Sequence, residues 1–338
     1  MDLILRSRHS PTLKFSRFRT PTSALLSSLL LLVIVIMAGC GKPPSEPLRI
    51  VSSPWPGYEP LYLARDLGYL DKTDVRLIEL PSSNITLEAF SNGSADIATL
   101  TLDETLTLLA QDRKVRILAI MDISNGGDAV MAKPEIKTLA DMKNKRVAIV
   151  NIPLGIYMLR RTLESAGLNS EDVTVIAIPE DKHQKAYLRD EIDVAITFEP
   201  FKTHLAEEGA HTLFDSSQIP NEIFDLLLVR EDAYNSRREE LCKLINVWYQ
   251  TLDYINEHPE DSARRMGKRL GMDPDSYLLA MQGLILPNRM ENSHLLGGPS
   301  PGLLAPAKRL EEIMQHEKML PRSVDVSSAI DPHFQNCL

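Results

Sequence analysis

Acidic and aromatic residues that could hold a ligand follow short apolar runs of the chain, where strands are predicted to end. Asp103, Asp122 and Glu199 could hold an amino or other cationic group, and Trp55 and Tyr58 could stack on it or form cation–π contacts. Helix capping and hinge hydrogen bonding are the alternative roles of each acid. Packing against the core is the alternative for Trp55.

Hydroxyl and amide side chains stand at the same kind of position and favour the opposite charge. Serines and free backbone N–H groups at helix starts are natural anion sites. The candidates of this kind are Ser53, Ser82, Ser83, Thr101 and Asn151. The acids slightly favour a ligand that carries an amino or cationic group. We expect both sets of residues to line one ligand-binding site.

The sequence contains none of the motifs that would indicate an enzyme. It has no nucleophile motif, no Walker sequence and no glycine fingerprint of a dinucleotide site, and its eight histidines show no paired ligand spacing. Thr101 and Glu104 match a capping box, which we favour over a ligand role for Glu104. We therefore predict a binding protein without a cofactor or a metal.

Alternating strands and helices must position the candidate residues. Apolar runs predict strands at 48–51, 75–80, 96–99, 115–123, 146–150, 173–178, 194–197, 211–214 and 223–229, and the apolar segment 129–132 follows the turn after the fourth of these. Helical spacing predicts helices at 61–70, 85–92, 101–109, 156–166 and 182–188, and Glu199-Pro200 starts a further helix. The chain from Ala233 is largely helical, and the tail beyond about Leu286 is rich in Pro, Gly and Ser, with one helix at 304–316. In open α/β sheets, ligands bind beyond the carboxyl ends of the strands, which is where the candidates fall.

A weak internal repeat suggests two lobes built on one plan. Leu80-Pro81, a short helix and the strand at 96–99 are echoed by Ile178-Pro179, a short helix and a strand that begins at Asp193. Each lobe would then present a strand-to-helix turn to a common cleft. These turns are residues 101–103 and 197–199, and we expect them to face each other.

The N-terminus has the pattern of an export signal. Basic residues precede an apolar run at 24–38, which is shorter than the roughly 20 residues of a comfortable membrane span. The run ends in Met37-Ala-Gly-Cys40, which resembles a bacterial lipobox and predicts lipid attachment at Cys40. An uncleaved signal anchor is the weaker alternative. Both place the folded part outside the cytoplasm.

Composition narrows the class of partner. The chain has 338 residues, 43% hydrophobic and 25% charged, as is ordinary for one large or two medium domains. Its formal net charge of -9 argues against a nucleic-acid partner. Cys242 and Cys337 could form a disulfide, or could be a buried thiol and a thiol in a loose tail.

Three phrases carry a resemblance to a known family. Residues 55–70, 89–98 and 198–201 resemble segments of solute-binding proteins of ABC importers, the nitrate/sulfonate/taurine and thiamine-precursor (SsuA/THI5-like, NMT1-like) group. The resemblance implies a type II periplasmic binding protein fold of the α/β class, with two α/β lobes around a central cleft, joined by two crossover strands. The turn at 151–155 lacks the Ser/Thr-rich phrase common in that group for gripping an oxyanion, which argues against a sulfonate or nitrate ligand.

The resemblance also implies domain boundaries and a function. A signal peptide would cover 1–40 and a tether 41–47; the first lobe would comprise 48–130 and 223–338, and the second 131–222. A lipid-anchored protein in the periplasm or on the outer face of a bacterial membrane would capture a small molecule and deliver it to an ABC permease and ATPase. A sensory protein that presents its ligand to a membrane signalling partner is the alternative, and a pyrimidine-synthase-like enzyme is less favoured.

Overall fold

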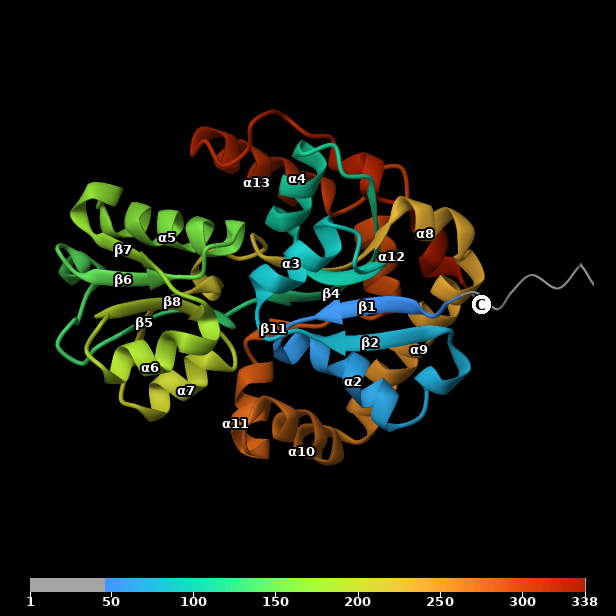
Figure 1. Ribbon diagram of the computed structural model, residues 1–338, viewed down its shortest axis with the longest axis horizontal. Coiled ribbons are helices and arrows are strands. Elements are labelled where there is room, and N and C mark those ends of the chain that lie inside the picture. Colours follow the sequence, from blue (N-terminus) through green and yellow to red (C-terminus); the bar gives the residue numbers. More distant parts are fainter. Residues whose placement is uncertain (1–45, 338) are drawn as a thin grey trace, which may run out of the picture. The chain divides into compact units, whose positions relative to one another are not determined.

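The computed structural model describes residues 46–337, which contain two β-sheets flanked by helices (Figure 1). The expected signal peptide and lipidated Cys40 lie outside the described residues, as does all but the end of the tether. Within the described range, no helix combines the length and the apolar character that crossing a bilayer requires.

The first sheet has six strands in the order β11-β4-β10-β3-β1-β2. They are β1 (Leu48–Ser52), β2 (Val75–Glu79), β3 (Ile97–Thr101), β4 (Val115–Ser124), β10 (Phe224–Arg230) and β11 (Leu284–Ile285). Strand β1 runs parallel to β2 and β3, and β10 runs antiparallel between β3 and β4. The expected return of the chain at 223–229 to the first set of strands is therefore confirmed, whereas β11 was not predicted.

The second sheet has five strands in the order β7-β6-β8-β5-β9. They are β5 (Asp128–Ala132), β6 (Arg146–Ile149), β7 (Thr174–Ala177), β8 (Val194–Phe198) and β9 (His211–Asp215). Strand β6 runs parallel to β7 and β8, and β5 runs antiparallel to β8. Each sheet thus has a parallel trio followed by an antiparallel strand, so the two sheets share one plan.

Helices cover both faces of each sheet, as parallel strands require. They are α2 (Glu59–Asp66), α3 (Ser83–Ser91) and α4 (Leu102–Ala110) in the first lobe, and α5 (Pro153–Ala166), α6 (His183–Leu188) and α7 (Phe201–Glu207) in the second. Figure 1 shows α2 on one face of the first sheet, with α3 and α4 on the other, and α5 opposite α6 and α7 on the second. Helix α5 ends at Gly167, whose φ of 66° is the left-handed conformation favoured there.

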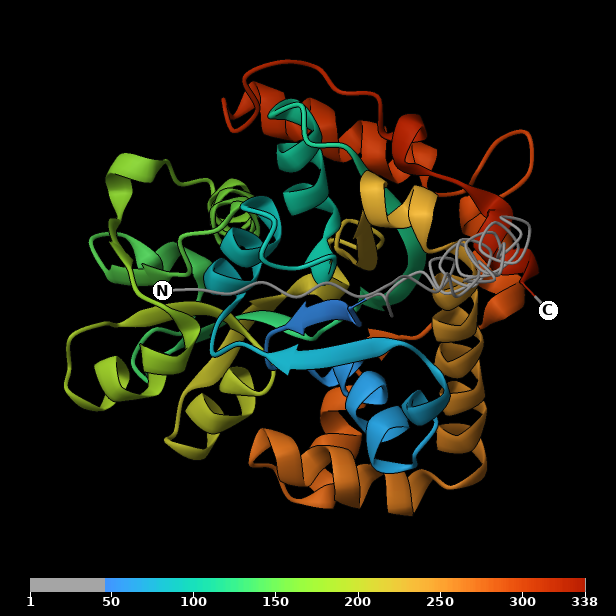
Figure 2. The ribbon, with the colours of Figure 1, turned by 45° about the vertical axis from the view of Figure 1, so that its right-hand side comes forward.

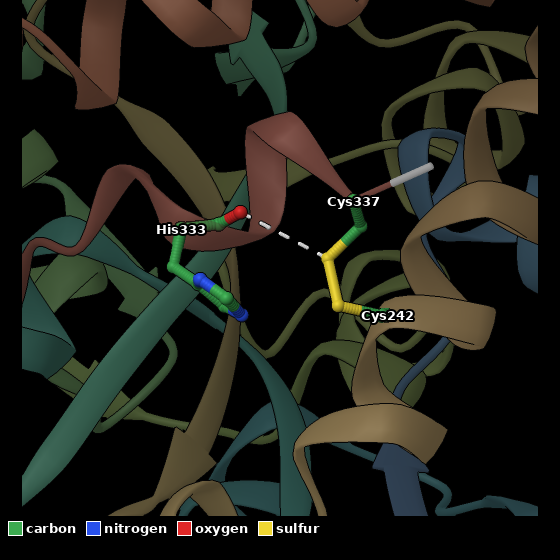
Figure 3. A group of neighbouring side chains, drawn as sticks. All are labelled: Cys242, His333 and Cys337. Atoms are coloured by element: carbon green, nitrogen blue, oxygen red, sulfur yellow. Dashed lines mark hydrogen bonds between the residues drawn. A yellow bond between two sulfur atoms is a disulfide. The ribbon is translucent and has the colours of Figure 1, made fainter.

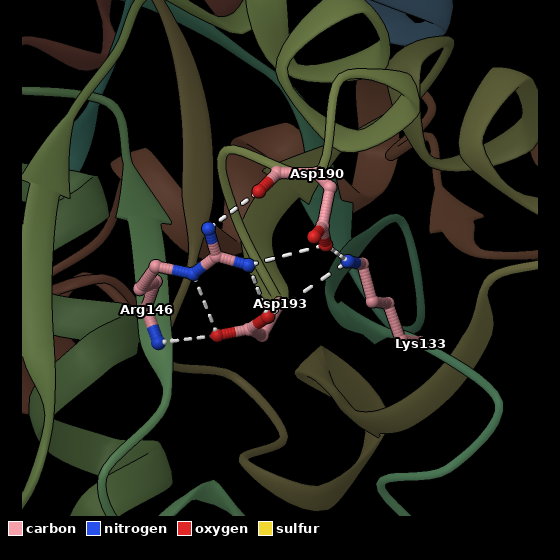
Figure 4. A network of polar contacts seen from close by, with 4 residues as sticks. All are labelled: Lys133, Arg146, Asp190 and Asp193. Atoms are coloured by element: carbon pink, nitrogen blue, oxygen red, sulfur yellow. Dashed lines mark hydrogen bonds and ion pairs between the residues drawn. The ribbon is translucent and has the colours of Figure 1, made fainter.

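An arginine–aspartate clamp recurs in the two lobes. Arg49 donates from its backbone N–H and from Nε to Asp96 Oδ2, at 2.9 and 3.0 Å, and from Nη2 to Oδ1. Arg146 makes the same three hydrogen bonds to Asp193, and both pairs are 47 residues apart (Figure 4). The contact ties the first strand of each trio to the residue that precedes the third, so the weak sequence repeat is also a structural one.

The C-terminal part is helical and packs against the first sheet, as Figures 1 and 2 show by its gold to red colours. Its helices are α8 (Glu231–Ser236), α9 (Arg238–Glu257), α10 (Pro259–Leu270), α11 (Pro274–Met281), α12 (Arg289–Leu296) and α13 (Leu304–His316). Trp248 is buried in the core, as its position in the apolar stripe of α9 predicts. The bounds of α13 are those expected from the sequence.

A disulfide joins helix α9 to the C-terminal tail. Cys242 and Cys337 are bonded, with their Cα atoms 5.4 Å apart, and exposed His333 lies beside them (Figure 3). The structure thereby decides between the two alternatives that the sequence left open for these cysteines.

A candidate ligand-binding cleft between the lobes

A small cavity lies where the carboxyl ends of strands from both sheets meet. It measures about 30 Å³, room for about two water molecules. Its lining comes from both lobes: Ser53, Trp55, Tyr58, Ser83, Thr99, Leu100, Thr101, Glu104, Asp128, Ile152, Leu154, Phe198 and Asp225. The lobes are therefore closed on each other, and a bound solute would require them to part.

Aromatic rings face each other across the cavity. Trp55, in the turn after β1, and Phe198, at the end of β8, meet edge to face with ring centroids 5.9 Å apart and planes at 81°. Tyr58 lies on the Trp55 side, at 6.4 Å between centroids. Edge-to-face pairs are a favourable aromatic arrangement. The two rings, contributed by different sheets, therefore touch each other where the lobes meet.

Two buried aspartates hold the side chains of Trp55 and Tyr58 in place. The Trp55 indole Nε1–H donates to Asp122 Oδ2 at 2.9 Å, and the Tyr58 hydroxyl donates to Asp225 Oδ1. Asp122 on β4 and Asp225 on β10 are directly opposite each other in the sheet. Burial raises the pKa of Asp122 to about 7, and burial together with the charge of Asp122 raises the pKa of Asp225.

Gly57 lets the Trp55 loop approach Asp122 closely. A Cβ atom at this position would lie 1.8 Å from Asp122 Oδ2 and 2.7 Å from Trp55 Nε1, inside the space of the hydrogen bond that joins them. Any larger residue would push the indole away from its carboxylate. The turn therefore depends on glycine at this position.

Three more buried acids surround the cavity. Asp103, Glu104 and Asp128 are at most 3% exposed. Burial raises the pKa of Asp103 to about 6 and that of Asp128 to about 8, and it raises the pKa of Glu104, to which the charge of Asp103 adds. Carboxylates are ordinarily left buried only when they are paired or hydrogen-bonded.

Several acceptor atoms around the cavity have no hydrogen-bond partner among the described residues. They are Asp103 Oδ2, Glu104 Oε1, Asp122 Oδ1, Asp128 Oδ2 and the hydroxyls of Thr99 and Thr101. No lysine or arginine of the described chain lines the cavity. The nearby Lys202 ammonium donates to the Gly126 carbonyl at 2.9 Å and lies 3.6 Å from Glu199. The cleft thus gathers several buried carboxyl groups and has no cationic side chain among its lining residues in the described chain.

Half of the residues predicted from the sequence line this cavity and half do not. Ser53, Trp55, Tyr58, Ser83 and Thr101 line it, from three strand-end turns of the first lobe.

The other candidates lie around it or away from it. Asp103 and Asp122 are buried just behind the lining, whereas the side chain of Asn151 is exposed. The Ser82 hydroxyl donates to Asn84, and Glu199 accepts from the Thr203 backbone N–H at the start of α7. Ser82 and Glu199 do not line the cavity because their side chains form hydrogen bonds within their own turns, and Asn151 does not because its side chain is exposed to solvent.

The sequence reasoning missed several lining residues. Asp225 lies inside the apolar run at 223–229, where an acid in a buried strand is the signal that could have revealed it. Asp128 follows the glycine turn between β4 and β5, and no sequence motif marks it as a ligand-binding residue. The capping role of Glu104 is confirmed, since its Oε2 accepts from the Thr101 backbone N–H at 2.9 Å, but its other oxygen belongs to the cavity.

Two lobes with a cleft at their strand ends define the periplasmic binding protein fold, as comparison with solved structures shows. The alkanesulfonate-binding protein SsuA from Xanthomonas axonopodis pv. citri, bound to MOPS, superposes with a TM-score of 0.73 at 16% identity, over 86% of this chain and 99% of that one. A Candida albicans protein described as having the generic periplasmic binding protein fold gives 0.67 at 15% identity, over 85% and 96%. The desulfurization enzyme DszB, in complex with biphenyl-2-sulfinic acid, gives 0.64 at 16% identity, over 85% and 98%.

A family profile described as NMT1/THI5 like matches residues 55–262, more than half of the chain, and the chain belongs to this family. A curated relative, the putative binding protein BAB2_1146 of Brucella abortus (strain 2308), is 26% identical over 193 residues. That match covers 56% of this chain and 60% of the relative, so it spans less than two thirds of the relative's length.

Proposed function

We propose that this protein is an extracytoplasmic solute-binding protein that closes its two lobes around a small organic cation. The observation that carries the proposal is the set of buried acids at the cleft, Asp103, Glu104, Asp122, Asp128 and Asp225. Four of them present an oxygen atom without a partner in the described chain, and no basic side chain lines the cavity. A cation with several N–H donors would form hydrogen bonds with these atoms and favour the ionised forms of the acids.

The acids of the cleft argue against a sulfonate ligand. SsuA proteins are described as binding alkanesulfonates, but at 16% identity they share only the fold with this chain. A sulfonate would disfavour the ionised forms of Asp128, Asp225 and Glu104 still further, whereas a cation would favour these forms and lower the pKa values of the three acids. The unpartnered carboxyl oxygens accept hydrogen bonds once the acids are ionised, so a cation that supplies N–H donors would fit them.

The arrangement of the acids favours an organic cation over a metal ion. Among the described residues, no three carboxylates of the cleft bring oxygen atoms within 4.8 Å of one another. A metal ion needs such convergence, whereas an extended molecule can reach oxygen atoms that are spread along the cleft. Trp55, Tyr58 and Phe198 would contact its flat or apolar part.

Delivery to an ABC permease and lipid anchoring at Cys40 complete the proposal. The first lobe would comprise 48–130 and 223–338, and the second 131–222, although β5 already begins at Asp128. Membrane fractionation tests the anchor: wild-type protein should sediment with membranes, and Cys40→Ser should release it. A neighbouring permease and ATPase gene pair would support uptake, whereas a neighbouring kinase or cyclase would support the sensory alternative.

An enzymatic role has less support. DszB shares the fold at 16% identity, and the sequence lacks the cysteine-rich motif of pyrimidine synthases. Both cysteines in the described range are joined in a disulfide, and neither lines the cavity.

A ligand screen tests the proposed binding function directly. Thermal unfolding would be followed with amidines, aminopyrimidines and polyamines, and with methanesulfonate and taurine as anionic or zwitterionic counterparts. A cation at a hundredfold excess over its Kd should add about 2.7 kcal/mol, or about 5 °C for a chain of this size. Asp225→Asn should lose this shift, and Asp253→Asn, an exposed acid, should keep it. Shifts with methanesulfonate but with no cation would refute the proposal.

A further inference from the structure

A carboxylate of the second lobe rests on a helix N-terminus of the first. Glu180 follows β7, and Ser83 is the first residue of α3, which follows β2. The Ser83 backbone N–H and hydroxyl both donate to Glu180 Oε1, at 2.7 and 3.0 Å. Because β2 and β7 belong to different sheets, these hydrogen bonds cross from lobe to lobe.

Helix α3 has no side-chain cap of its own. The hydroxyl of its N-cap residue, Ser82, donates to Asn84 Oδ1 at 2.7 Å and makes no capping hydrogen bond. The first turn also contains no acid. A helix N-terminus carries unpaired N–H groups and the positive end of the helix dipole, so it favours an anion. Glu180 supplies that anion from across the cleft.

This helix end opens onto the cavity. Ser83 lines the cavity, and its hydroxyl lies 3.4 Å from that of Ser53. Glu180 is fully buried, and its second oxygen, Oε2, has no hydrogen-bond partner within the described range. A buried carboxylate with only one bonded oxygen depends on Ser83 for its stabilisation. The contact therefore exists only while the lobes are together.

Ser83 and Glu180 lie in corresponding turns of the two lobes. Each turn follows the second strand of the parallel trio in its sheet, β2 in the first lobe and β7 in the second. One lobe presents a helix N-terminus at this position, and the other presents an acid that fits it. The repeat thus brings the two positions together where the lobes meet.

We propose that Glu180 acts as a built-in anion, which holds the lobes closed in the absence of solute and bars external anions from the N-terminus of α3. The inference rests on the hinge motion that the proposed function requires. It explains how an α/β cleft of this kind can reject sulfate or a sulfonate although a helix N-terminus faces it. The hydrogen bonds between Glu180 and Ser83, here called the latch, would have to break before a solute could enter.

Hydrogen exchange and X-ray scattering on the ligand-free protein test the latch. Glu180→Ala and Glu180→Gln should speed exchange of the Ser83 amide by about tenfold or more, since it loses a charge-assisted hydrogen bond. Both variants should also increase the radius of gyration. Asp181→Ala is the matched control, because Asp181 is the exposed neighbouring acid and pairs with Lys182. Unchanged exchange and an unchanged radius in both variants would overturn the proposal.

Sulfate titration tests the exclusion of anions. The Ser83 amide resonance should shift with sulfate in Glu180→Ala and stay fixed in the wild type and in Asp181→Ala. If the resonance also stays fixed in Glu180→Ala at high sulfate, Glu180 does not occupy an anion site. Glu180→Gln keeps the shape of the side chain and serves if the alanine variant folds poorly. Neither readout uses a cationic solute, so the latch and the proposed function fail independently.

Discussion

Replacing Asp128 by asparagine separates the binding function of the cleft from its effect on stability. Asp128 begins β5, lies opposite Phe198 in the sheet and lines the cavity. Its backbone N–H donates to the Ser124 hydroxyl, while its Oδ2 is unpartnered in the described structure. Burial, and next the charge of Asp225, raises its pKa from 3.8 to about 8. Asparagine keeps the shape of the side chain and cannot ionise.

The raised pKa gives the direction and the size of the effect. Above pH 4 the unfolded chain has released a proton that folded Asp128 still holds, so stability falls as pH rises toward the folded pKa. Each pH unit in this window costs about 1.4 kcal/mol, so wild-type protein should lose about 3 kcal/mol from this group between pH 5 and pH 7. Asp128→Asn removes that loss and should be more stable than the wild type at pH 7.

Urea unfolding of the ligand-free proteins at pH 5 and pH 7 measures this difference. Wild type and Asp128→Asn should be closer in free energy of unfolding at pH 5 and should diverge by about 3 kcal/mol more at pH 7. The exposed Asp253→Asn variant should follow the wild type at both values. Asp128→Asn should meanwhile bind the cationic solute far more weakly. If Asp128→Asn is less stable than the wild type at pH 7, or keeps the same pH dependence of stability, burial does not raise the pKa of Asp128 as argued.

Other perturbations follow from contacts elsewhere in the molecule. Cys242→Ser opens a cross-link of 95 residues and should cost about 4 kcal/mol in urea unfolding, an effect that reducing the wild-type protein should reproduce. Asp193→Asn breaks the clamp with Arg146, which lowers the pKa of Asp193 to about 2; it should cost about 1 to 2 kcal/mol at pH 7, and the difference should vanish as pH falls from 4 toward 2. Gly57→Ala would clash with Asp122, so it should lower the free energy of unfolding by about 1 to 3 kcal/mol and change the tryptophan fluorescence spectrum. An unchanged spectrum and unchanged stability would contradict the close approach.

The fold was predictable because each element carries a local signal. The central strands of the sheets are buried on both faces and have continuous apolar sequences, of which β3 and β4 are the clearest. Proline, glycine and serine mark the strand ends, and helical periodicity marks the intervening segments. The short strand β11 and helix α12 were missed, since two residues of strand and an eight-residue helix with few apolar positions give little periodicity.

The site was only half predictable because strand-end position is local, whereas orientation and pairing are not. The exposed Asn151 and the cavity-lining Thr101 both follow strands, and only the completed lobes decide which side chain faces the cleft. Asp225 lies in a strand that returns from the second lobe, so its position opposite Asp122 depends on pairing across a long stretch of chain. A single residue can also have two roles, as Glu104 shows by capping α4 with one oxygen and facing the cavity with the other.

The two lobes share a scaffold but contribute different chemistry to the cleft. From the first lobe come the hydroxyls of Ser53, Ser83, Thr99 and Thr101, the acids Glu104 and Asp225, and two aromatic rings. From the second come Asp128 and three apolar side chains, those of Ile152, Leu154 and Phe198. For the cation proposed here, the first lobe holds most of the acceptors and would receive the ligand, while the second covers it and excludes water. Such exclusion strengthens every charge interaction beneath the apolar cover. Once the latch has opened, the asymmetry therefore favours binding to the first lobe before the second lobe closes again.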